Sequence, residues 1–182
     1  GERVAVLKIL LLRFGKWPLI FLEKIVIYII CYMQFPPQDP ENIDQYLNRY
    51  PGDDYVDVVG PDSYSLWNQN SVSKLARVLS DLSVLAKERG KVAALTEVGI
   101  ENVAISDWWT NYLLRALRNK EYPNNMAWAL VWRNRSQSHH FGPYREHPSQ
   151  NDFLQFFRDP STLFLSDIEK FWVPTSMIAD HE

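Results

Sequence analysis

The sequence contains a single cysteine, Cys31, in 182 residues. One thiol can neither form a disulfide within the chain nor build a cysteine-rich zinc site. An excess of positive charge is also missing, because 19 lysine and arginine side chains are set against 22 aspartates and glutamates, for a net charge of -3. This balance excludes the basic surface expected of a nucleic-acid-binding domain.

The sequence has little that could cross a membrane. Its N-terminal apolar stretch, Leu19–Met33, is shorter than the about 20 consecutive residues that a spanning helix needs, and Glu23 and Lys24 lie inside it. A signal peptide fits no better, because no small-residue cleavage site follows and the chain starts with Gly1. We rank a buried strand over 25–32 first, non-native sequence second and a membrane anchor third.

Aromatic residues, in contrast, are abundant: seven Trp, nine Tyr and nine Phe. The chain is 46% hydrophobic and 23% charged, which is typical of a globular domain rather than a disordered chain. Seven tryptophans are many for one core, and flat aromatic faces also bind sugar rings. Composition therefore leaves two roles open for these side chains, core packing and ligand stacking.

After the proline-rich stretch Phe35–Pro40, which breaks any regular element, strand patterns alternate with helix patterns. Short apolar runs predict strands, and apolar residues at helical spacing predict helices. A cap at Ser106 or Asp107 predicts where one helix begins, and the spacing from Ser149 to Asp152 is that of a capping box. The predicted strands are Tyr55–Gly60, Lys91–Thr96 and Met126–Trp132, and the predicted helices are Ser71–Arg89, a helix ending near Arg118, and one after Ser149.

This alternation predicts an α/β fold with parallel strands covered by helices. A doubly wound sheet and a (β/α)8 barrel both fit, but no glycine-rich phosphate loop follows any of the strands. Polar residues follow each strand instead, and in a barrel those positions surround the mouth where catalytic groups lie. We therefore favour a partial (β/α)8 barrel of about three to four β/α units, because a complete one needs about 250 residues.

Glu97 is the strongest candidate for chemistry. It ends an apolar strand, where a carboxylate is costly to bury without a partner. One interpretation is a structural ion pair with an arginine such as Arg133. The other is a nucleophile for retaining glycoside hydrolysis, which uses a second carboxylic acid about 5 to 5.5 Å away.

Between about Gln45 and Phe171 the sequence contains several distinctive stretches: Tyr50–Gly60 with Asp62–Tyr64, Ala94–Gly99, Val131–Asn134, His140–Tyr144 with His147–Ser149, and Asp152–Pro160. In this order they closely resemble glycoside hydrolase family 26, the β-mannanases. They match a strand, the nucleophile strand, the last strand with the loop after it, and the closing helix of that family. The resemblance implies a retaining (β/α)8 hydrolase of which this chain is the C-terminal half.

The resemblance also implies roles for individual residues. Glu97 is expected to be the nucleophile, and Tyr64 to donate a hydrogen bond that orients it. Trp132 is expected to lie under the sugar at the cleavage point, and Arg133 to bind the neighbouring sugar. The alternatives are a half-buried tyrosine for Tyr64, core packing for Trp132 and strand-end pairing for Arg133.

Two further residues complete the expected substrate-binding set. Asp62 follows the first strand at the mouth. Trp109 lies with Trp108 beyond the nucleophile strand, where stacking on sugar and packing on a helix fit equally well. The resemblance implies no metal and no organic cofactor.

The sequence also departs from the family pattern. Pro61 stands where the family usually has an aromatic residue. The family's general acid/base is a glutamate directly after a histidine on an earlier strand, but the one His-Glu pair here is His181–Glu182, far downstream. General acid catalysis typically contributes 10²–10⁴-fold. We therefore expect little or no turnover from this chain.

We divide the chain into an atypical segment, residues 1–35, produced by a shifted reading frame or a chimeric join, and hydrolase sequence over 36–182. The expected ligand is β-mannan or a related β-linked polysaccharide, with self-association through open barrel edges. An extracellular or periplasmic location follows from the resemblance alone. The alternatives are a non-catalytic carbohydrate-binding or structural remnant and a membrane-anchored protein.

Overall fold

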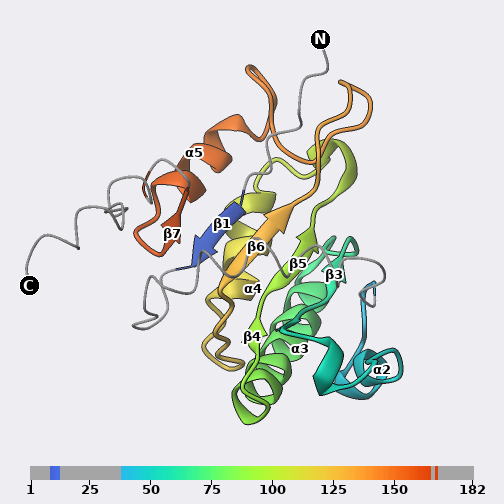
Figure 1. Cartoon of the computed structure of the whole chain (residues 1–182). Coiled ribbons are helices and arrows are strands. Elements are labelled where there is room, and N and C mark those ends of the chain that lie inside the picture. The colour runs from blue at the N-terminus through green and yellow to red at the C-terminus, as the bar shows by residue number, and fades with distance from the viewer. Residues whose placement is uncertain (1–8, 13–37, 165–166, 168–182) are drawn as a thin grey trace, which may run out of the picture.

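The computed structural model describes residues 9–12, 38–164 and 167. The strand predicted over 25–32 lies outside the described residues, and so does the rest of the 1–35 segment except for one strand, β1 (Ile9–Leu12). Within the described parts, strands and helices alternate along the chain (Figure 1). No helix there is both long and apolar enough to cross a membrane.

Seven strands form two sheets in the described residues. The larger sheet has the order β3-β5-β6-β1-β7, and the smaller one pairs β2 with β4. The remaining strands are β2 (Val58–Val59), β3 (Asp62–Ser63), β4 (Val92–Ala93), β5 (Leu95–Val98), β6 (Trp128–Val131) and β7 (Thr162–Leu163).

The predicted α/β class and the parallel pairing of the three predicted strands are confirmed. β2 runs parallel to β4, and β5 runs parallel to both β3 and β6. Two strands break the pattern, because β1 is antiparallel to β6 on one side and to β7 on the other. β6 is therefore hydrogen bonded along both edges.

The first predicted strand, Tyr55–Gly60, is wrong at its start. A short 3-10 helix, η1 (Asp53–Tyr55), precedes the strand, and only Val58 and Val59 belong to β2. Two residues, Gly60 and Pro61, separate β2 from β3. Pro61 has no N–H to add to the ladder, and Gly60 approaches Ala94 closely. A Cβ atom at Gly60 would lie 2.0 Å from the Ala94 carbonyl oxygen.

Helix α3 (Gln69–Glu88) follows the prediction for Ser71–Arg89 and begins two residues earlier. The Asn68 side chain accepts a hydrogen bond from the Ser71 N–H, and the Ser71 hydroxyl accepts one from the Asn68 N–H. This capping box satisfies donors that the first turn leaves free. Its apolar stripe, which includes Leu75, Leu79 and Leu82, is buried.

The second predicted helix is a π-helix, η3 (Trp109–Leu114), that continues into α4 (Arg115–Leu117). Neither Ser106 nor Asp107 caps it. Asp152 does so instead, from helix α5 (Gln150–Arg158), by accepting from the N–H groups of Trp109 and Thr110 at 2.8 and 3.2 Å.

The predicted capping box at Ser149 is therefore also wrong. Ser149 precedes α5 but its side chain makes no capping bond. Its hydroxyl contacts Nδ1 of His147 and accepts from the indole of Trp109, while Asp152 serves the neighbouring helix.

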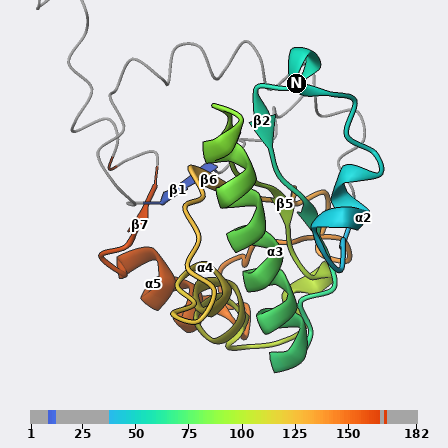
Figure 2. The same cartoon turned by 90° about the horizontal axis from the view of Figure 1, so that it is seen from below.

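The main core lies on one face of the strands. Helices α3, α4 and α5 all lie on that side (Figure 2), and their apolar residues pack with Val59, Ala93, Leu95 and Ala129. Alternate residues of the same strands face the other way, where Val58, Val92, Ala94, Trp128 and Leu130 form a second, smaller cluster. Short helices α2 (Ile43–Leu47) and η2 (Glu101–Val103) complete the described elements.

Candidate active site

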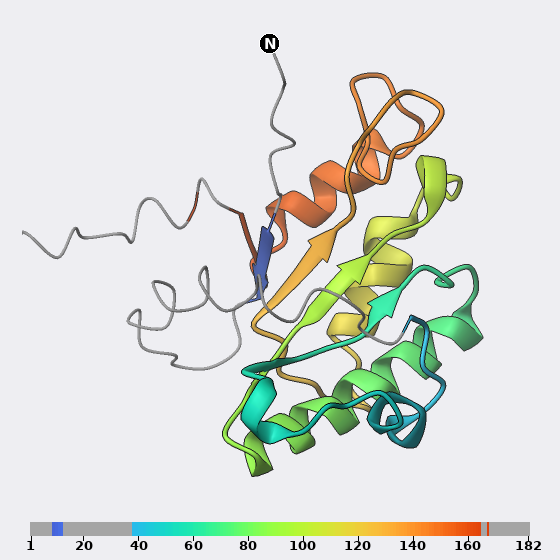
Figure 3. The ribbon, with the colours of Figure 1, turned by 45° about the vertical axis from the view of Figure 1, so that its right-hand side comes forward.

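The predicted site residues come together at the carboxyl ends of β3, β5 and β6, whose arrows point the same way (Figure 3). Tyr64 directly follows β3, and Glu97 is the third residue of β5. Trp132 and Arg133 follow β6. Because parallel strands end at one edge of a sheet, residues more than thirty positions apart become neighbours there.

Glu97 and Tyr64 are in direct contact. The Tyr64 hydroxyl donates a hydrogen bond to Oε2 of Glu97 at 2.5 Å. Both side chains are partly exposed. Among the described residues, Glu97 takes part in none of the ion pairs, and Arg133 is exposed. The structural interpretation of Glu97 as the partner of Arg133 is therefore not supported.

Burial and the hydrogen bond between the two groups both shift their pKa values. Burial raises the pKa of Glu97, and the hydrogen bond from Tyr64 partly opposes this by stabilising the carboxylate. Burial also raises the pKa of the Tyr64 phenol, and the adjacent Glu97 carboxylate raises it further. Tyr64 consequently remains a donor at any physiological pH, and its donated proton stabilises the charge on Glu97.

Asp62 lies beside Glu97, because the two residues are register partners in the β3–β5 pair. Its Oδ1 accepts a hydrogen bond from the Thr96 hydroxyl at 3.0 Å. Burial, followed by the charge of Glu97, raises the pKa of Asp62 to about 7. The site thus contains two carboxyl groups, of which Asp62 is partly protonated near neutral pH.

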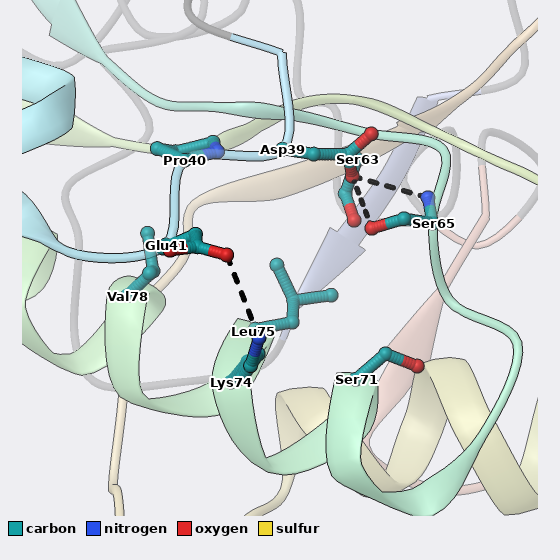
Figure 4. A pocket seen from close by; sticks show the side chains of 9 residues that line it. All are labelled: Asp39, Pro40, Glu41, Ser63, Ser65, Ser71, Lys74, Leu75 and Val78. Atoms are coloured by element: carbon teal, nitrogen blue, oxygen red, sulfur yellow. Dashed lines mark hydrogen bonds and ion pairs between the residues drawn. The ribbon is translucent and has the colours of Figure 1, made fainter.

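Asp39 fixes the backbone of Tyr64, a role that the sequence did not reveal. Its Oδ1 accepts hydrogen bonds from the Tyr64 N–H at 2.9 Å, and from the Ser65 N–H and hydroxyl at 3.1 and 2.7 Å. Figure 4 shows the contact with Ser65 at the edge of a pocket that Lys74 and Glu41 also line. The only signal in the sequence is an aspartate followed by Pro40, which marks a turn.

Trp132 and Arg133 emerge from the end of β6. The Trp132 N–H donates to the Val98 carbonyl at 3.1 Å, which extends the ladder between β5 and β6 by one residue. The Trp132 ring is half-buried against the smaller cluster, and the Arg133 guanidinium lies 5.8 Å from its centroid. A partly exposed indole next to an exposed cation is compatible with the expected sugar-binding roles.

The prediction of a sugar-stacking surface at Trp109 is wrong. Trp109 is 1% exposed and Trp108 is fully buried, so neither ring face is open to a ligand. Trp109 packs edge-on against Trp108 and Phe153, and the Trp108 indole donates to the Leu66 carbonyl at 3.1 Å. These side chains form the core between η3 and α5.

The loop after β6 is fastened over the end of β5. The Asn102 N–H donates to the His140 carbonyl at 2.7 Å, and Nδ1 of His139 lies 2.6 Å from Oε1 of Glu101. On the far side of the loop, Nε2 of His147 lies 3.2 Å from the Asn102 carbonyl oxygen. The loop is therefore fixed in place beside Glu97.

The donor sets do not favour a metal site. Among the residues that the structure describes, no group of three or more histidine, cysteine, aspartate or glutamate side chains could hold an ion. The arrangement is a hydrogen-bonded carboxylate with an aromatic residue and a cation nearby, which suits nucleophilic chemistry on a neutral, hydroxyl-rich ligand.

Comparison with known proteins points to one family. Residues 25–141 match the model of Glycosyl hydrolase family 26. A mannan endo-1,4-beta-mannosidase of Bifidobacterium adolescentis is 44% identical over 63 residues, which cover 30% of this chain and 6% of that protein. The match to the family includes the second part of the 1–35 segment.

Solved structures show the same likeness. The β-mannanase BoMan26A from Bacteroides ovatus is 34% identical with a TM-score of 0.63, over 80% of this chain and 41% of its own. GH26C from a Muricauda species is 32% identical with a TM-score of 0.64, over 76% of this chain and 39% of its own. A modular endo-beta-1,4-mannanase from Cellulomonas fimi is 32% identical with a TM-score of 0.64, over 70% of this chain and 30% of its own. The chain thus spans less than half the length of these relatives.

Proposed function

The chain belongs to glycosyl hydrolase family 26, and from this membership we propose that it is the nucleophile-bearing part of an endo-β-1,4-mannanase that hydrolyses β-mannan with retention. The observation that carries the proposal is the hydrogen bond between Tyr64 and Glu97 near the end of β5, the strand that pairs with the one before Trp132 and Arg133.

In the proposed reaction, a carboxylate oxygen of Glu97 attacks the anomeric carbon of a mannosyl unit. A covalent glycosyl-enzyme forms as the bond to the leaving oxygen breaks, and that oxygen keeps the bonding electron pair and takes a proton from solvent. Water later attacks the same carbon, gives a proton to solvent and frees the Glu97 carboxylate, so the configuration is retained. Tyr64 keeps the carboxylate aimed and charged, while Trp132 and Arg133 hold the sugars on either side of the cleaved bond. Asp62 contributes a hydrogen-bonding carboxyl group to the same subsite.

We further propose that the described strands are the later part of a (β/α)8 barrel. Three parallel strands covered by helices on one face, with polar residues at their carboxyl ends, support this. The smaller cluster would then face the barrel interior. Because the family match starts at residue 25, we place the proposed join with unrelated sequence upstream of that residue. Translating the coding DNA in its other frames tests the join.

Two parts of the proposal concern the surroundings of the chain. We propose export to an extracellular or periplasmic location, which is usual for the family, and cell fractionation tests it. We also propose self-association through uncovered strand edges, since exposed edges invite pairing. Light scattering at several protein concentrations tests this, and a monomer at every concentration would rule it out.

Covalent trapping tests the nucleophile directly. A 2,4-dinitrophenyl 2-deoxy-2-fluoro-β-mannoside needs no acid catalyst, because its leaving group departs as a stable phenolate with the bonding electron pair. Attack by Glu97 should add one fluorosugar to the intact mass, and peptide mapping should place it on Glu97. Glu97→Gln should remain unlabelled, whereas Glu88→Gln, at the exposed end of α3, should label like the parent.

A label that persists in Glu97→Gln would contradict the proposal.

The second candidate function is a non-catalytic carbohydrate-binding remnant, favoured by the lack of a His-Glu pair ahead of Glu97. It predicts retention of the chain on a mannan-containing affinity gel without covalent labelling. Weaker retention of Trp132→Ala and Arg133→Ala is expected under both functions, so the label decides between them.

A further inference from the structure

The ring of Tyr64 lies against a residue to which the proposed reaction gives no role. The centroids of Tyr64 and Phe141 are 5.6 Å apart, with the rings at 74° in an edge-to-face arrangement. Phe141 is only 6% exposed although it lies in the loop after β6. Edge-to-face pairs of this kind contribute about 0.5–1.5 kcal/mol beyond the area that they bury.

The backbone of Phe141 is held by one side chain. Oδ1 of Asn134 accepts from the N–H groups of Phe141 and Gly142 at 2.9 and 2.8 Å, and Nδ2 of Asn134 donates to the Gly142 carbonyl at 2.9 Å. Asn134 follows Arg133 at the end of β6. The loop is thus tied to the segment directly after β6, which bears two of the proposed sugar-binding residues.

The Phe141 ring packs directly against Gly99. A Cβ atom at Gly99 would lie 2.6 Å from Cδ1 of Phe141, closer than real Cβ atoms approach. Gly99 follows β5 two residues after Glu97, so the ring occupies the space that a side chain would fill at the end of the nucleophile strand. Its other neighbour is the ring of His139, at 5.4 Å and 83°.

Tyr64 is consequently fixed at three points by three different segments. Asp39 holds its N–H, Glu97 holds its hydroxyl, and Phe141 flanks its ring. A tyrosine side chain has two rotatable bonds. With the backbone N–H and the hydroxyl of Tyr64 both hydrogen bonded, the remaining sideways motion of the ring is limited by the side chain that packs beside it.

We propose that Phe141 is a positioning residue for the nucleophile: by packing beside the Tyr64 ring, it keeps the Tyr64 hydroxyl aimed at Glu97. This inference rests on the proposed function of Glu97 and extends it to the loop after β6. Phe141 acts through Tyr64 and does not itself touch the reacting atoms.

The first test measures the rate of covalent trapping. Phe141→Ala should lower the rate of labelling by between about 10- and 100-fold, because small misplacements of reacting groups have effects of this size. Phe141→Leu, which keeps apolar bulk, should retain part of the rate. Gly99→Ala should also slow labelling, since it displaces the Phe141 ring without removing it.

A double-mutant cycle separates positioning from general damage. In a Tyr64→Phe background, where there is no hydroxyl to aim, Phe141→Ala should cause little further loss. Phe157→Ala, at a partly exposed ring on α5, is the matched control and should leave labelling unchanged. An equal loss from Phe141→Ala with and without the Tyr64 hydroxyl would overturn the proposal.

A second readout needs no substrate, so it separates the failure of this inference from the failure of the proposed function. The Tyr64 hydroxyl is hydrogen bonded to the Glu97 carboxylate with 2.5 Å between the two oxygens. Its proton should therefore give a downfield resonance that Tyr64→Phe removes. This resonance should weaken or disappear in Phe141→Ala and Gly99→Ala, and it should persist in Phe157→Ala. If it persists unchanged in both Phe141→Ala and Gly99→Ala, the proposal is wrong, whether or not Glu97 becomes labelled. Circular dichroism of each variant establishes that it is folded.

Discussion

At the scale of single residues, two carboxyl groups in register on neighbouring strands have different environments. Glu97 receives a hydrogen bond from a phenol, which stabilises its charge, whereas Asp62 receives one from the Thr96 hydroxyl and also faces the charge of Glu97. Burial raises the pKa of both groups, and a hydrogen bond from a neighbouring hydroxyl opposes the rise at each of them. At Asp62 the charge of Glu97 raises the pKa further.

The raised pKa of Asp62 predicts a pH dependence of stability. Its folded pKa of about 7 lies above the ordinary aspartate value of 3.8, so the folded chain holds this proton more tightly than the unfolded chain does. The stabilisation is complete below about pH 4 and is lost as the pH rises through 7. Asp62→Asn should remove this contribution, so that the parent loses more unfolding free energy than the variant between pH 5 and pH 8.

Urea unfolding of both proteins at the two pH values measures this difference. Burial lowers the pKa of His147, which gives a trend of opposite sign below pH 6.5, but that trend is common to both proteins and cancels in the comparison. Equal changes in the parent and in Asp62→Asn would show that Asp62 titrates normally.

The sequence predicted the contact between Glu97 and Tyr64 but not the residues that support it. The strand pattern placed both polar residues at one edge of the parallel strands, whereas the family resemblance implied the hydrogen bond between them. Asp39 and Phe141 come from segments 25 and 77 residues away from Tyr64, and no local pattern reports a contact that loops create. Trp109 fails for the opposite reason, because a tryptophan after a strand looks the same in sequence whether it faces a ligand or a helix.

At the scale of elements, the capping of η3 by a residue of α5 is the clearest departure from local rules. The sequence Ser149–Asp152 has the spacing of a capping box, but tertiary packing brings Asp152 to the start of a different helix. Thr110 also donates its hydroxyl to Asp152. Periodicity therefore predicted where helices occur, while the partners of their ends depended on how they pack.

This cap predicts an asymmetry between two aspartates. Asp152→Ala should lower the free energy of unfolding by about 1 kcal/mol or more, because free N–H groups at a helix start lose their acceptor. Asp107→Ala, at the residue that local rules favour as the cap, should cost less, since the Asp107 carboxylate accepts from the exposed Asn111 side chain and not from a backbone N–H at the helix start. Chemical denaturation measures both, and an equal or larger loss in Asp107→Ala would show that the cap lies at Asp107.

At the scale of the whole molecule, Glu97 is the proposed nucleophile, and the given sequence has no His-Glu pair ahead of it. The proposed reaction should therefore depend steeply on the leaving group. Activated dinitrophenyl glycosides should react, whereas release of reducing sugar from mannan should be slower by about 10²–10⁴-fold than with an acid catalyst in place.

Reducing-sugar assays on mannan beside phenolate release from activated glycosides provide the measurement. Glu97→Gln should abolish both activities. Rapid mannan cleavage that Glu97→Gln abolishes would show that another group donates the proton, and the partly protonated Asp62 would be the first one to replace.

Strand β6 has partners on both edges, β5 on one and the antiparallel β1 on the other. A strand that is hydrogen bonded along both edges does not separate easily from the sheet, and Trp132 extends the pairing through its N–H bond to the Val98 carbonyl. The backbone of Trp132 is thus fixed by the sheet, and its indole packs against the smaller cluster in the absence of any ligand. A sugar that bound there would not have to order this segment, because its conformational entropy is already lost on folding.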